Sequence, residues 1–161
     1  MATPAQLDAL RALVQEARAS QHIWPEMAAC EACLETAWLT SELGREYRNL
    51  FGQKCPIVDG NPTPPDGVLK VSFPTQEWDG TKYVGIRACF LWFTSFADAF
   101  SHRMALLEGA AVKYPAYAAA LHASTAQEYV LAVSRTWSTD PARGSKCIEI
   151  YNAHRDVLTA V

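Results

Sequence analysis

Two glutamates stand one helical turn apart in an apolar stretch of the chain. Glu31 and Glu35 flank Ala32-Cys33-Leu34, and residues four apart share one face of a helix. Cleavage of a glycosidic bond requires a carboxylic acid that keeps its proton near neutral pH, and burial or a neighbouring negative charge provides this. Glu35 fits the role, because it lies near the C-terminal end of the predicted helix, where the helix dipole disfavours a negative charge. Glu31 would add to the effect if both were buried, whereas spacing alone favours two solvated helix residues.

The cysteines and histidines give weaker signals of chemistry. Cys30 and Cys33 have C-x-x-C spacing inside a helix, without a second cysteine pair or a histidine pair at zinc-ligand spacing, so no metal site is expected. The number of cysteines is odd and no export signal is visible, so the thiols are expected to be free and mostly buried. They are Cys30, Cys33, Cys55, Cys89 and Cys147. The histidines are scattered and form no recognisable catalytic arrangement.

Helices are predicted for most of the chain around these residues. Thr3-Pro4-Ala5-Gln6 is a capping box that begins a first helix, and Trp24-Pro25 precedes a second over residues 26–39. A short helical turn is predicted at residues 41–46. Later helices are predicted from Ser95 to Gly109, from the Thr125 capping box to about Arg135, and after Asp140-Pro141.

The middle of the chain changes to the pattern of strands. Residues 53–67 are rich in proline and glycine and are predicted to form a loop. Residues 68–73 and 75–78 favour a strand, Asp79-Gly80 a two-residue hairpin turn, and residues 81–93 the return strand. The prediction is an α+β fold dominated by α, with one small β-hairpin lobe, in a single domain of residues 1–161.

Composition excludes several kinds of partner. Half of the 161 residues are hydrophobic, 19% are charged and the net charge is −3, which is typical of a globular protein and gives no basic surface for nucleic acid. No stretch approaches the roughly 18 uninterrupted apolar residues of a membrane span. The N-terminus shows no signal peptide, so we expect synthesis in the cytoplasm, with release or export needed to reach an extracellular target.

One set of motifs resembles a known family. Leu34-Glu35-Thr36-Ala37-Trp38 leads through Ser41 and Leu43 to Asn49-Leu50-Phe51-Gly52, which resembles the signature of the glucosaminidase family of flagellar rod-cap hydrolase domains and bacterial autolysins. The family pattern is roughly Leu-Glu-Ser-Gly-Trp-Gly, a Ser, a Leu and Asn-Leu-Phe-Gly. The similarity covers about residues 25 to 155 and includes Thr75-Gln76-Glu77, Tyr117-Ala118 and Thr139-Asp140-Pro141.

The resemblance implies a fold and an activity. It implies a lysozyme-like domain that cleaves the bond between N-acetylglucosamine and N-acetylmuramic acid in peptidoglycan, without a metal or other cofactor. Glu35 matches the general acid of the family. Glu77, on the hairpin, matches a second carboxylate that helps to position or activate water; its alternative is a surface strand residue. The candidate substrate contacts are Trp38, Asn49, Phe51, Gly52, Trp137 and Asp140.

The chain departs from the family pattern at three places. Thr36, Ala37 and Leu39 replace small residues after the acid, which predicts a bulkier floor of the cleft. Glu31 stands where a Gln is usual. Trp137 stands where a Tyr is usual; its ring can stack on a sugar, but its N–H is not an ionisable hydroxyl.

Other functions on the same fold remain open at this point. A muramidase or a lytic transglycosylase shares the catalytic Glu but differs in the bond or the product, and an inactive glycan-binding or assembly protein keeps the cleft alone. Trp78, like Trp38, is a candidate for the wall of a sugar cleft or for the core. We expect a monomer that acts on peptidoglycan strands, either as a phage endolysin or as an injected antibacterial toxin with an immunity protein as partner.

Overall fold

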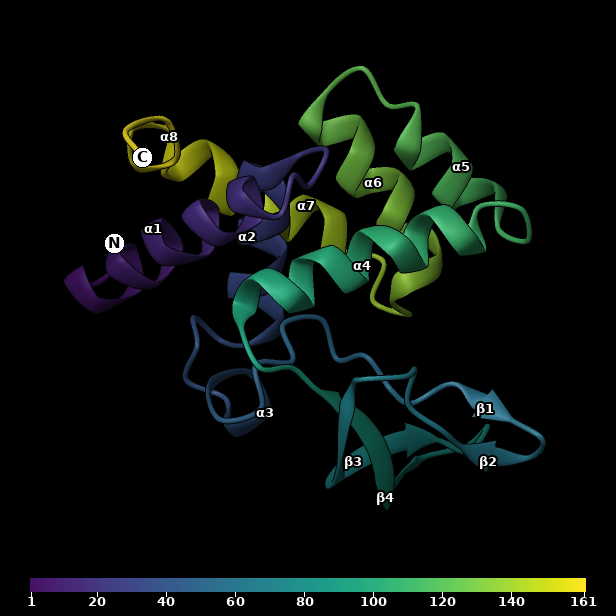
Figure 1. The fold of residues 1–161 in the computed structure, drawn as a ribbon. Helices are drawn as coiled ribbons and strands as arrows, with labels where there is room; N and C mark the ends of the chain where they lie inside the picture. Colours follow the sequence, from purple (N-terminus) through teal and green to yellow (C-terminus); the bar gives the residue numbers. More distant parts are fainter.

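The protein consists of a helical body and a small β lobe beneath it (Figure 1). The structure, a computed structural model, describes residues 1–161 apart from the side chain of Trp78. The helices of the body are α1 (Pro4–Ala19), α2 (Pro25–Glu35), α4 (Phe96–Ala110), α5 (Pro115–Leu121), α6 (Ala126–Trp137), α7 (Arg143–Ala153) and α8 (Arg155–Thr159). The lobe side holds α3 (Glu42–Arg45), β1 (Ile57–Val58), β2 (Asn61–Pro62), β3 (Leu69–Trp78) and β4 (Tyr83–Trp92). The prediction of a mainly helical α+β fold with a hairpin lobe is confirmed.

Helix α2 lies at the centre of the body. It packs against α1, α6 and α7, and every residue from Met27 to Cys33 is buried. Small alanine and cysteine side chains on all sides let the neighbouring helices approach closely, which explains why α2 shows no polar face. Glu35 is the last residue of this buried helix, and at Glu35 the central helix reaches the surface.

Side-chain caps confirm the predicted helix starts at Thr3 and Thr125, whereas α2 and α7 begin without a side-chain cap. The Thr3 hydroxyl accepts a hydrogen bond from the Gln6 N–H, and the Gln6 side chain accepts one from the Thr3 N–H. The Thr125 hydroxyl accepts from the Glu128 N–H, which satisfies a backbone donor that the first turn leaves unpaired. The predicted capping box is incomplete, because the Glu128 carboxylate accepts from the Ser124 N–H and not from that of Thr125. The predicted stop at Gly109 was wrong by one residue, since α4 continues to Ala110.

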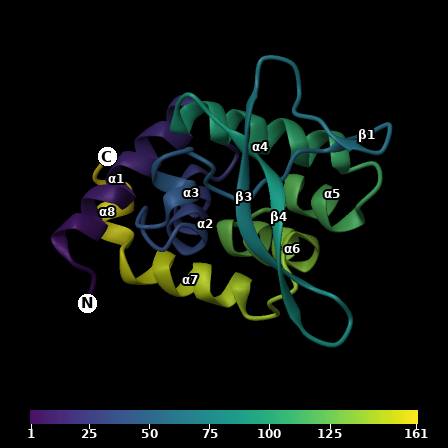
Figure 2. The same cartoon turned by 90° about the horizontal axis from the view of Figure 1, so that it is seen from below.

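The β lobe is built on one antiparallel hairpin that crosses in front of the helices (Figure 2). Strands β3 and β4 pair from Leu69↔Trp92 to Trp78↔Tyr83, so the connecting loop is residues 79–82 and not the predicted two-residue turn. The Asp79 carboxylate explains the longer loop, because it accepts hydrogen bonds from the Thr81 and Lys82 N–H groups. The predicted loop 53–67 also contains the short β1–β2 pair.

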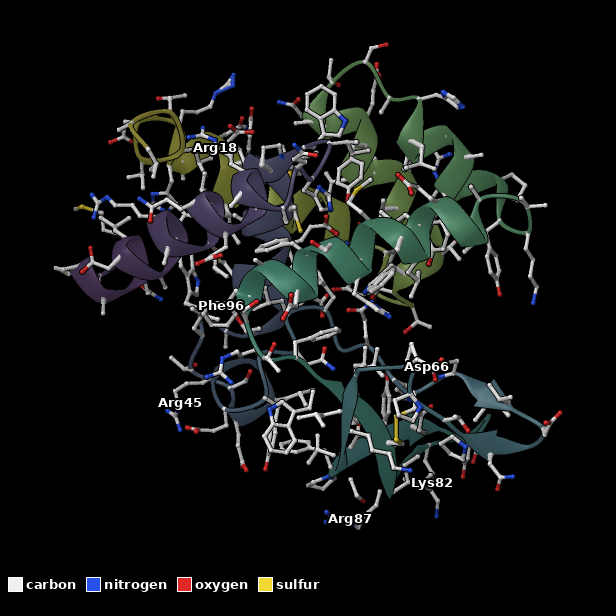
Figure 3. All side chains as sticks on the ribbon, in the orientation of Figure 1. Arg18, Arg45, Asp66, Lys82, Arg87 and Phe96 are labelled. Atoms are coloured by element: carbon white, nitrogen blue, oxygen red, sulfur yellow. A yellow bond between two sulfur atoms is a disulfide. The ribbon has the colours of Figure 1, made fainter. Side chains whose placement is uncertain are left out.

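A disulfide between Cys55 and Cys89 corrects the expectation that all cysteines are free. The bond is visible in yellow within the lobe (Figure 3). It forms because residues 54–55 run beside β4: Lys54 pairs with Phe90, and the Cys55 N–H donates to the Cys89 carbonyl. Residues 54–55 lie in the predicted loop 53–67 and Cys89 in the predicted return strand 81–93, so no local pattern indicated that Cys55 and Cys89 are bonded. The other thiols, Cys30, Cys33 and Cys147, are free and buried as expected.

The turn after α2 is made of left-handed residues that are not glycine. Helix α2 ends at Glu35, four residues before the predicted end, and Ala37, Trp38 and Leu39 have φ values of 48°, 61° and 61°. The Thr36 hydroxyl supports the turn by donating to the Ala32 carbonyl (2.6 Å) and accepting from the Leu39 N–H (3.0 Å). The left-handed region costs a non-glycine residue about 1–2 kcal/mol. The replacement of the family's small residues therefore strains the backbone beside Glu35.

A cluster of buried charges lies beneath this turn. Glu31 is fully buried, and its Oε2 accepts hydrogen bonds from Arg103 of α4 (2.9 Å) and Arg143 of α7 (2.8 Å), both of which are almost completely buried. Burial by itself raises the pKa of Glu31, but the two guanidinium charges outweigh this effect and lower the pKa to about 2. The cluster ties α2, α4 and α7 together.

The Glu31→Gln variant should be less stable by about 3–5 kcal/mol at pH 7, because two buried guanidinium groups lose their carboxylate. The pKa of Glu31 falls from 4.5 in the unfolded chain to about 2 in the folded protein. Its contribution is therefore fully present above pH 4.5 and is lost as the pH falls towards 2. Urea unfolding at pH 7, 4.5 and 2.5 should show that the difference in free energy of unfolding between wild type and variant shrinks as the pH falls.

Glu26→Gln, which breaks the partly exposed pair with Arg18, is the matched control and should cost about 1 kcal/mol or less. Equal stability of Glu31→Gln and wild type at pH 7 would refute the role of the cluster.

The Ala37→Gly variant should be more stable by about 1 kcal/mol, since glycine adopts positive φ without strain and this gain exceeds its extra loss of chain entropy. Ala37 is exposed, so little packing is lost. Ala119, exposed within α5, is the matched control, and Ala119→Gly should be less stable by about 1 kcal/mol. Thermal unfolding of both variants measures the two effects, and a loss of stability in Ala37→Gly would contradict the strain.

Candidate active site

A cleft opens where the end of α2 meets α4, α5, the end of α6 and the chain after Phe51. Its volume is about 430 Å³. The residues that line it are Glu35, Phe51, Gly52, Gln53, Lys54, Leu106, Tyr117, Thr136, Trp137 and Ser138. Of the predicted site residues, the structure thus brings Glu35, Phe51, Gly52 and Trp137 into one cavity, although they are far apart in the sequence.

Glu35 meets the cleft as a partly exposed carboxylate with a cationic partner. Its side chain is 28% exposed, and Oε1 accepts a hydrogen bond from Nε of Arg143 at 2.7 Å. The expectation that Glu31 places an unbalanced negative charge beside Glu35 was wrong. Glu31 is buried as that argument required, but Arg103 and Arg143 match its charge.

The Asn49–Gly52 segment forms one wall, with its residues in two different roles. Asn49 is 1% exposed, and its amide donates to the Gln53 and Leu91 carbonyls (both 2.8 Å) and accepts from the Gln53 N–H (2.9 Å). Asn49 therefore holds the wall against β4 from behind and does not reach the cleft. Gly52 is exposed with φ of +63°, a conformation that favours glycine, and places backbone on the cleft surface.

Trp137 and Phe51 form the floor on top of a buried guanidinium. The Trp137 indole N–H donates to the Phe51 carbonyl (3.2 Å). The guanidinium carbon of Arg103 lies 3.7 Å from the centre of the Trp137 ring and 4.3 Å from that of Phe51, which is cation–π geometry. Arg103 also binds Glu31. Two departures from the family pattern, Glu31 and Trp137, are therefore in contact through one residue.

Glu77 lies on β3, where it forms an ion pair with Lys54 of the cleft wall. The side chain of Glu77 is 40% exposed and that of Lys54 is 45% exposed. Lys54 lines the cleft together with Glu35, so the pair connects the hairpin to the rim of the cleft. Glu77 itself does not line the cavity among the residues that the structure describes.

The remaining predicted contacts lie outside this cavity. The Trp38 ring meets the His154 ring edge-on at 5.7 Å and packs on the core. Asp140 lines a neighbouring cavity of about 790 Å³ that shares residues 136–138 with the cleft. The Lys146 ammonium (2.7 Å) and the Ala142 N–H (2.9 Å) donate to its carboxylate and lower the pKa of Asp140. The side chain of Trp78 lies outside the described structure.

Sequence reasoning missed the two arginines and Tyr117 as parts of the site. The sequence feature that could have indicated the arginines is Glu31. Residues 27–34 are otherwise apolar, and a glutamate that is buried among apolar residues requires cations to balance its charge. Nothing in the sequence said which of the arginines would supply them. Tyr117 is part of the similarity at Tyr117-Ala118, which assigned it no role. Burial raises the pKa of Tyr117 above the usual value, which keeps it as a neutral hydroxyl at the cleft.

Neither a metal-binding cluster nor a membrane-spanning helix is present in the described part of the chain. No group of three or more His, Cys, Asp or Glu side chains is placed to hold a metal ion. Among the helices of that part, none combines the length and the apolar character needed to cross a membrane.

Comparison with known proteins identifies the fold and the family. Residues 11–156 match the model of the Glucosaminidase family, described as mannosyl-glycoprotein endo-beta-N-acetylglucosaminidase. Comparison with curated protein sequences gives no match. The catalytic domain of the autolysin Auto from Listeria monocytogenes has a TM-score of 0.74 at 20% identity, over 99% of this chain and 89% of that chain.

Other solved structures have the same fold. A peptidoglycan hydrolase mutant from Sphingomonas sp. A1 gives a TM-score of 0.72 at 21% identity, over 96% of this chain and 99% of that chain. The truncated glycoside hydrolase domain of FlgJ from Salmonella typhimurium gives 0.64 at 24% identity, over 94% and 98%. The family match covers nearly the whole chain and includes Glu35 and the wall of the cleft. The chain belongs to the glucosaminidase family of glycoside hydrolases and has a lysozyme-like fold.

Proposed function

We propose that the chain is a peptidoglycan hydrolase, an endo-β-N-acetylglucosaminidase that cleaves the β-1,4 bond between N-acetylglucosamine and N-acetylmuramic acid. The observation that carries the proposal is the carboxylate of Glu35, which opens into a cleft at the end of the central helix in a glucosaminidase-family domain. The autolysin and peptidoglycan hydrolase among the structural neighbours support the choice of polymer.

Glu35 acts as the general acid in this proposal. Oε1 is engaged by Arg143, and no donor to Oε2 is found among the described residues, so Oε2 is the oxygen that carries the proton. Protonation of the glycosidic oxygen lets the bond break through an oxocarbenium-like centre. Trp137, which is partly exposed, offers aromatic surface for the apolar face of a sugar.

The support for the oxocarbenium-like centre comes from Glu77 or from the acetamido group of the substrate. Glu77 is held at the rim of the cleft by Lys54. Movement of the hairpin towards the glycan would carry Glu77 inwards, as lobes and loops close over substrates in many enzymes.

The proposal includes a place of action. The Cys55–Cys89 disulfide supports work in an oxidising compartment, since such bonds are rare in the cytosol. Residues 1–161 then act as one catalytic domain and a monomer on glycan strands outside the cytoplasm. A phage lysis system or an antibacterial secretion machine would deliver it, and in the second case an immunity protein would cover the cleft.

Digestion of purified peptidoglycan and mass spectrometry of the products test the proposed bond. Reducing N-acetylglucosamine is the expected new chain end. Reducing muramic acid would identify a muramidase and an anhydro-sugar a lytic transglycosylase, and absence of products would leave a glycan-binding protein. Each of these three results would overturn the proposed reaction.

Glu35→Gln should lower the rate of peptidoglycan lysis roughly 10²–10⁴-fold, because glutamine keeps the shape and still accepts from Arg143 but has no proton to transfer. Loss of turbidity of a cell-wall suspension measures the rate, and thermal unfolding checks that the fold is kept. Glu108→Gln, an exposed position on α4, is the control and should lyse at the wild-type rate. A Glu35→Gln variant with most of the wild-type rate would remove Glu35 from the mechanism.

Glu77→Gln should lower kcat roughly 10-fold, less than the loss at Glu35, if the carboxylate assists the reaction from the hairpin. Thermal stability should hardly change, since an exposed ion pair contributes little. Glu46→Gln breaks the exposed pair with Arg45 at the end of α3 and serves as the control. Equal kcat in wild type and Glu77→Gln would make Glu77 a surface residue and leave the acetamido group of the substrate as the assisting group.

A further inference from the structure

Arg143 is a buried cation that contacts the proposed acid directly, although no motif in the sequence singled it out. It is 2% exposed and comes from the first turn of α7. Its Nε donates to Oε1 of Glu35 (2.7 Å), its Nη2 to Oε2 of Glu31 (2.8 Å) and its Nη1 to the Ser134 hydroxyl (2.9 Å). Every nitrogen of the guanidinium group thus has an acceptor, and the group is held by α2 and α6 at once.

This arrangement gives the two oxygens of Glu35 different tasks. A guanidinium group only donates hydrogen bonds, so Oε1 must accept and cannot carry a proton in this contact. The proton of the acid form therefore sits on Oε2. The planar fork of an arginine, held at three points, keeps this geometry better than a single flexible ammonium group.

The charges of the cluster also match the negative charge that Glu35 acquires when its proton is transferred. Arg103 and Arg143 carry two positive charges, and Glu31 carries one negative charge. With Glu35 protonated, the cluster has one excess positive charge, and with Glu35 ionised the charges balance. The negative charge that forms on Glu35 during proton transfer therefore meets a cation that is already in place and needs no rearrangement.

The other titratable groups around the cluster do not change this balance. Burial lowers the pKa of His22 to about 3, with a further contribution from Arg103, and burial raises the pKa of Cys147 to about 12. Burial raises the pKa of Tyr129 well above 10, and that of Tyr117 is also raised. These groups are neutral near pH 7. Lys54, on the cleft wall, is paired with Glu77.

We propose that Arg143 is a positioning residue for Glu35: it directs the transferable proton to Oε2 and stabilises the carboxylate that remains after transfer. The inference rests on the proposed function. In the step, the Oε2–H bond breaks and its electron pair stays on Glu35. The proton bonds to the glycosidic oxygen, and the bond between that oxygen and the anomeric carbon breaks with its pair on the oxygen. Water then forms a bond to the anomeric carbon and loses a proton, which completes the hydrolysis.

Arg143→Gln tests the proposal through the pH profile of kcat/KM on peptidoglycan fragments. Loss of the positive charge beside Oε1 makes ionisation of Glu35 less favourable in the variant than in the wild type, so the decline of activity at high pH should move upwards by about one pH unit. The kcat value at the optimum should fall about 10-fold, since a hydrogen bond to the developing charge is lost. Arg143→Lys keeps the charge but not the fork, so it should lower kcat and leave the high-pH decline in place.

Two further variants separate positioning from a purely structural role. Glu31→Gln leaves the cluster with more positive charge, so the high-pH decline should move downwards, opposite to its movement in Arg143→Gln. Ser134→Ala loosens the same guanidinium group without touching Glu35 and should leave the pH profile unchanged. If Arg143→Gln does not fold, the Glu31→Gln shift and the kcat of Arg143→Lys decide the question.

An unchanged pH profile in folded Arg143→Gln, a shift of the same sign in Glu31→Gln, or wild-type kcat in Arg143→Lys would each overturn the inference. Glu35→Gln distinguishes this failure from failure of the proposed function. If Glu35→Gln is inactive while Arg143→Gln behaves as wild type, Glu35 remains the acid and only the role of Arg143 is lost. If Glu35→Gln is active, the proposed acid itself is wrong.

Discussion

Glu31 places a negative charge in the centre of the helical body, and the structure around it is organised by the need to balance that charge. Arg103 lies on α4 and Arg143 on α7, and each donates a hydrogen bond to Oε2 of Glu31. A buried pair that loses one member is strongly destabilised, so the three helices are constrained to one relative arrangement. Glu35 lies one turn further along α2, and its position relative to α7 depends on the same contacts.

The cluster also connects the core to the floor of the cleft. Arg103 binds Glu31 with one nitrogen and lies against the rings of Trp137 and Phe51. Arg143 binds Glu31 and Glu35. Two of the residues that depart from the family pattern, Glu31 and Trp137, are thus linked by a single guanidinium group. In this chain, stability of the core and geometry of the cleft depend on the same charges.

The β lobe is attached by a different set of interactions, which converge on residues 49–55. The Asn49 amide holds the Gln53 backbone and the Leu91 carbonyl, Cys55 is bonded to Cys89, and Lys54 contacts Glu77. Gln53 and Lys54 line the cleft. A displacement of the hairpin would therefore act on the cleft wall, and the proposed role of Glu77, a carboxylate outside the cavity, depends on this connection.

Local sequence determined the helix starts, the hairpin strands, the family signature and the choice of Glu35, because caps, alternating strand patterns and motif spacing act within a few residues. The turn after α2 was not predicted by the local sequence. The helical pattern continues to Leu39, but tertiary packing ends the helix at Glu35 and imposes positive φ on three residues of the turn. The Cys55–Cys89 bond, the partners of Glu31 and the contact of Arg143 with Glu35 join residues 34, 72, 112 and 108 positions apart. Pairings over such distances depend on how helices and strands pack in space, and a single sequence holds no local signal for them, so only the tertiary structure decided which charges surround the acid.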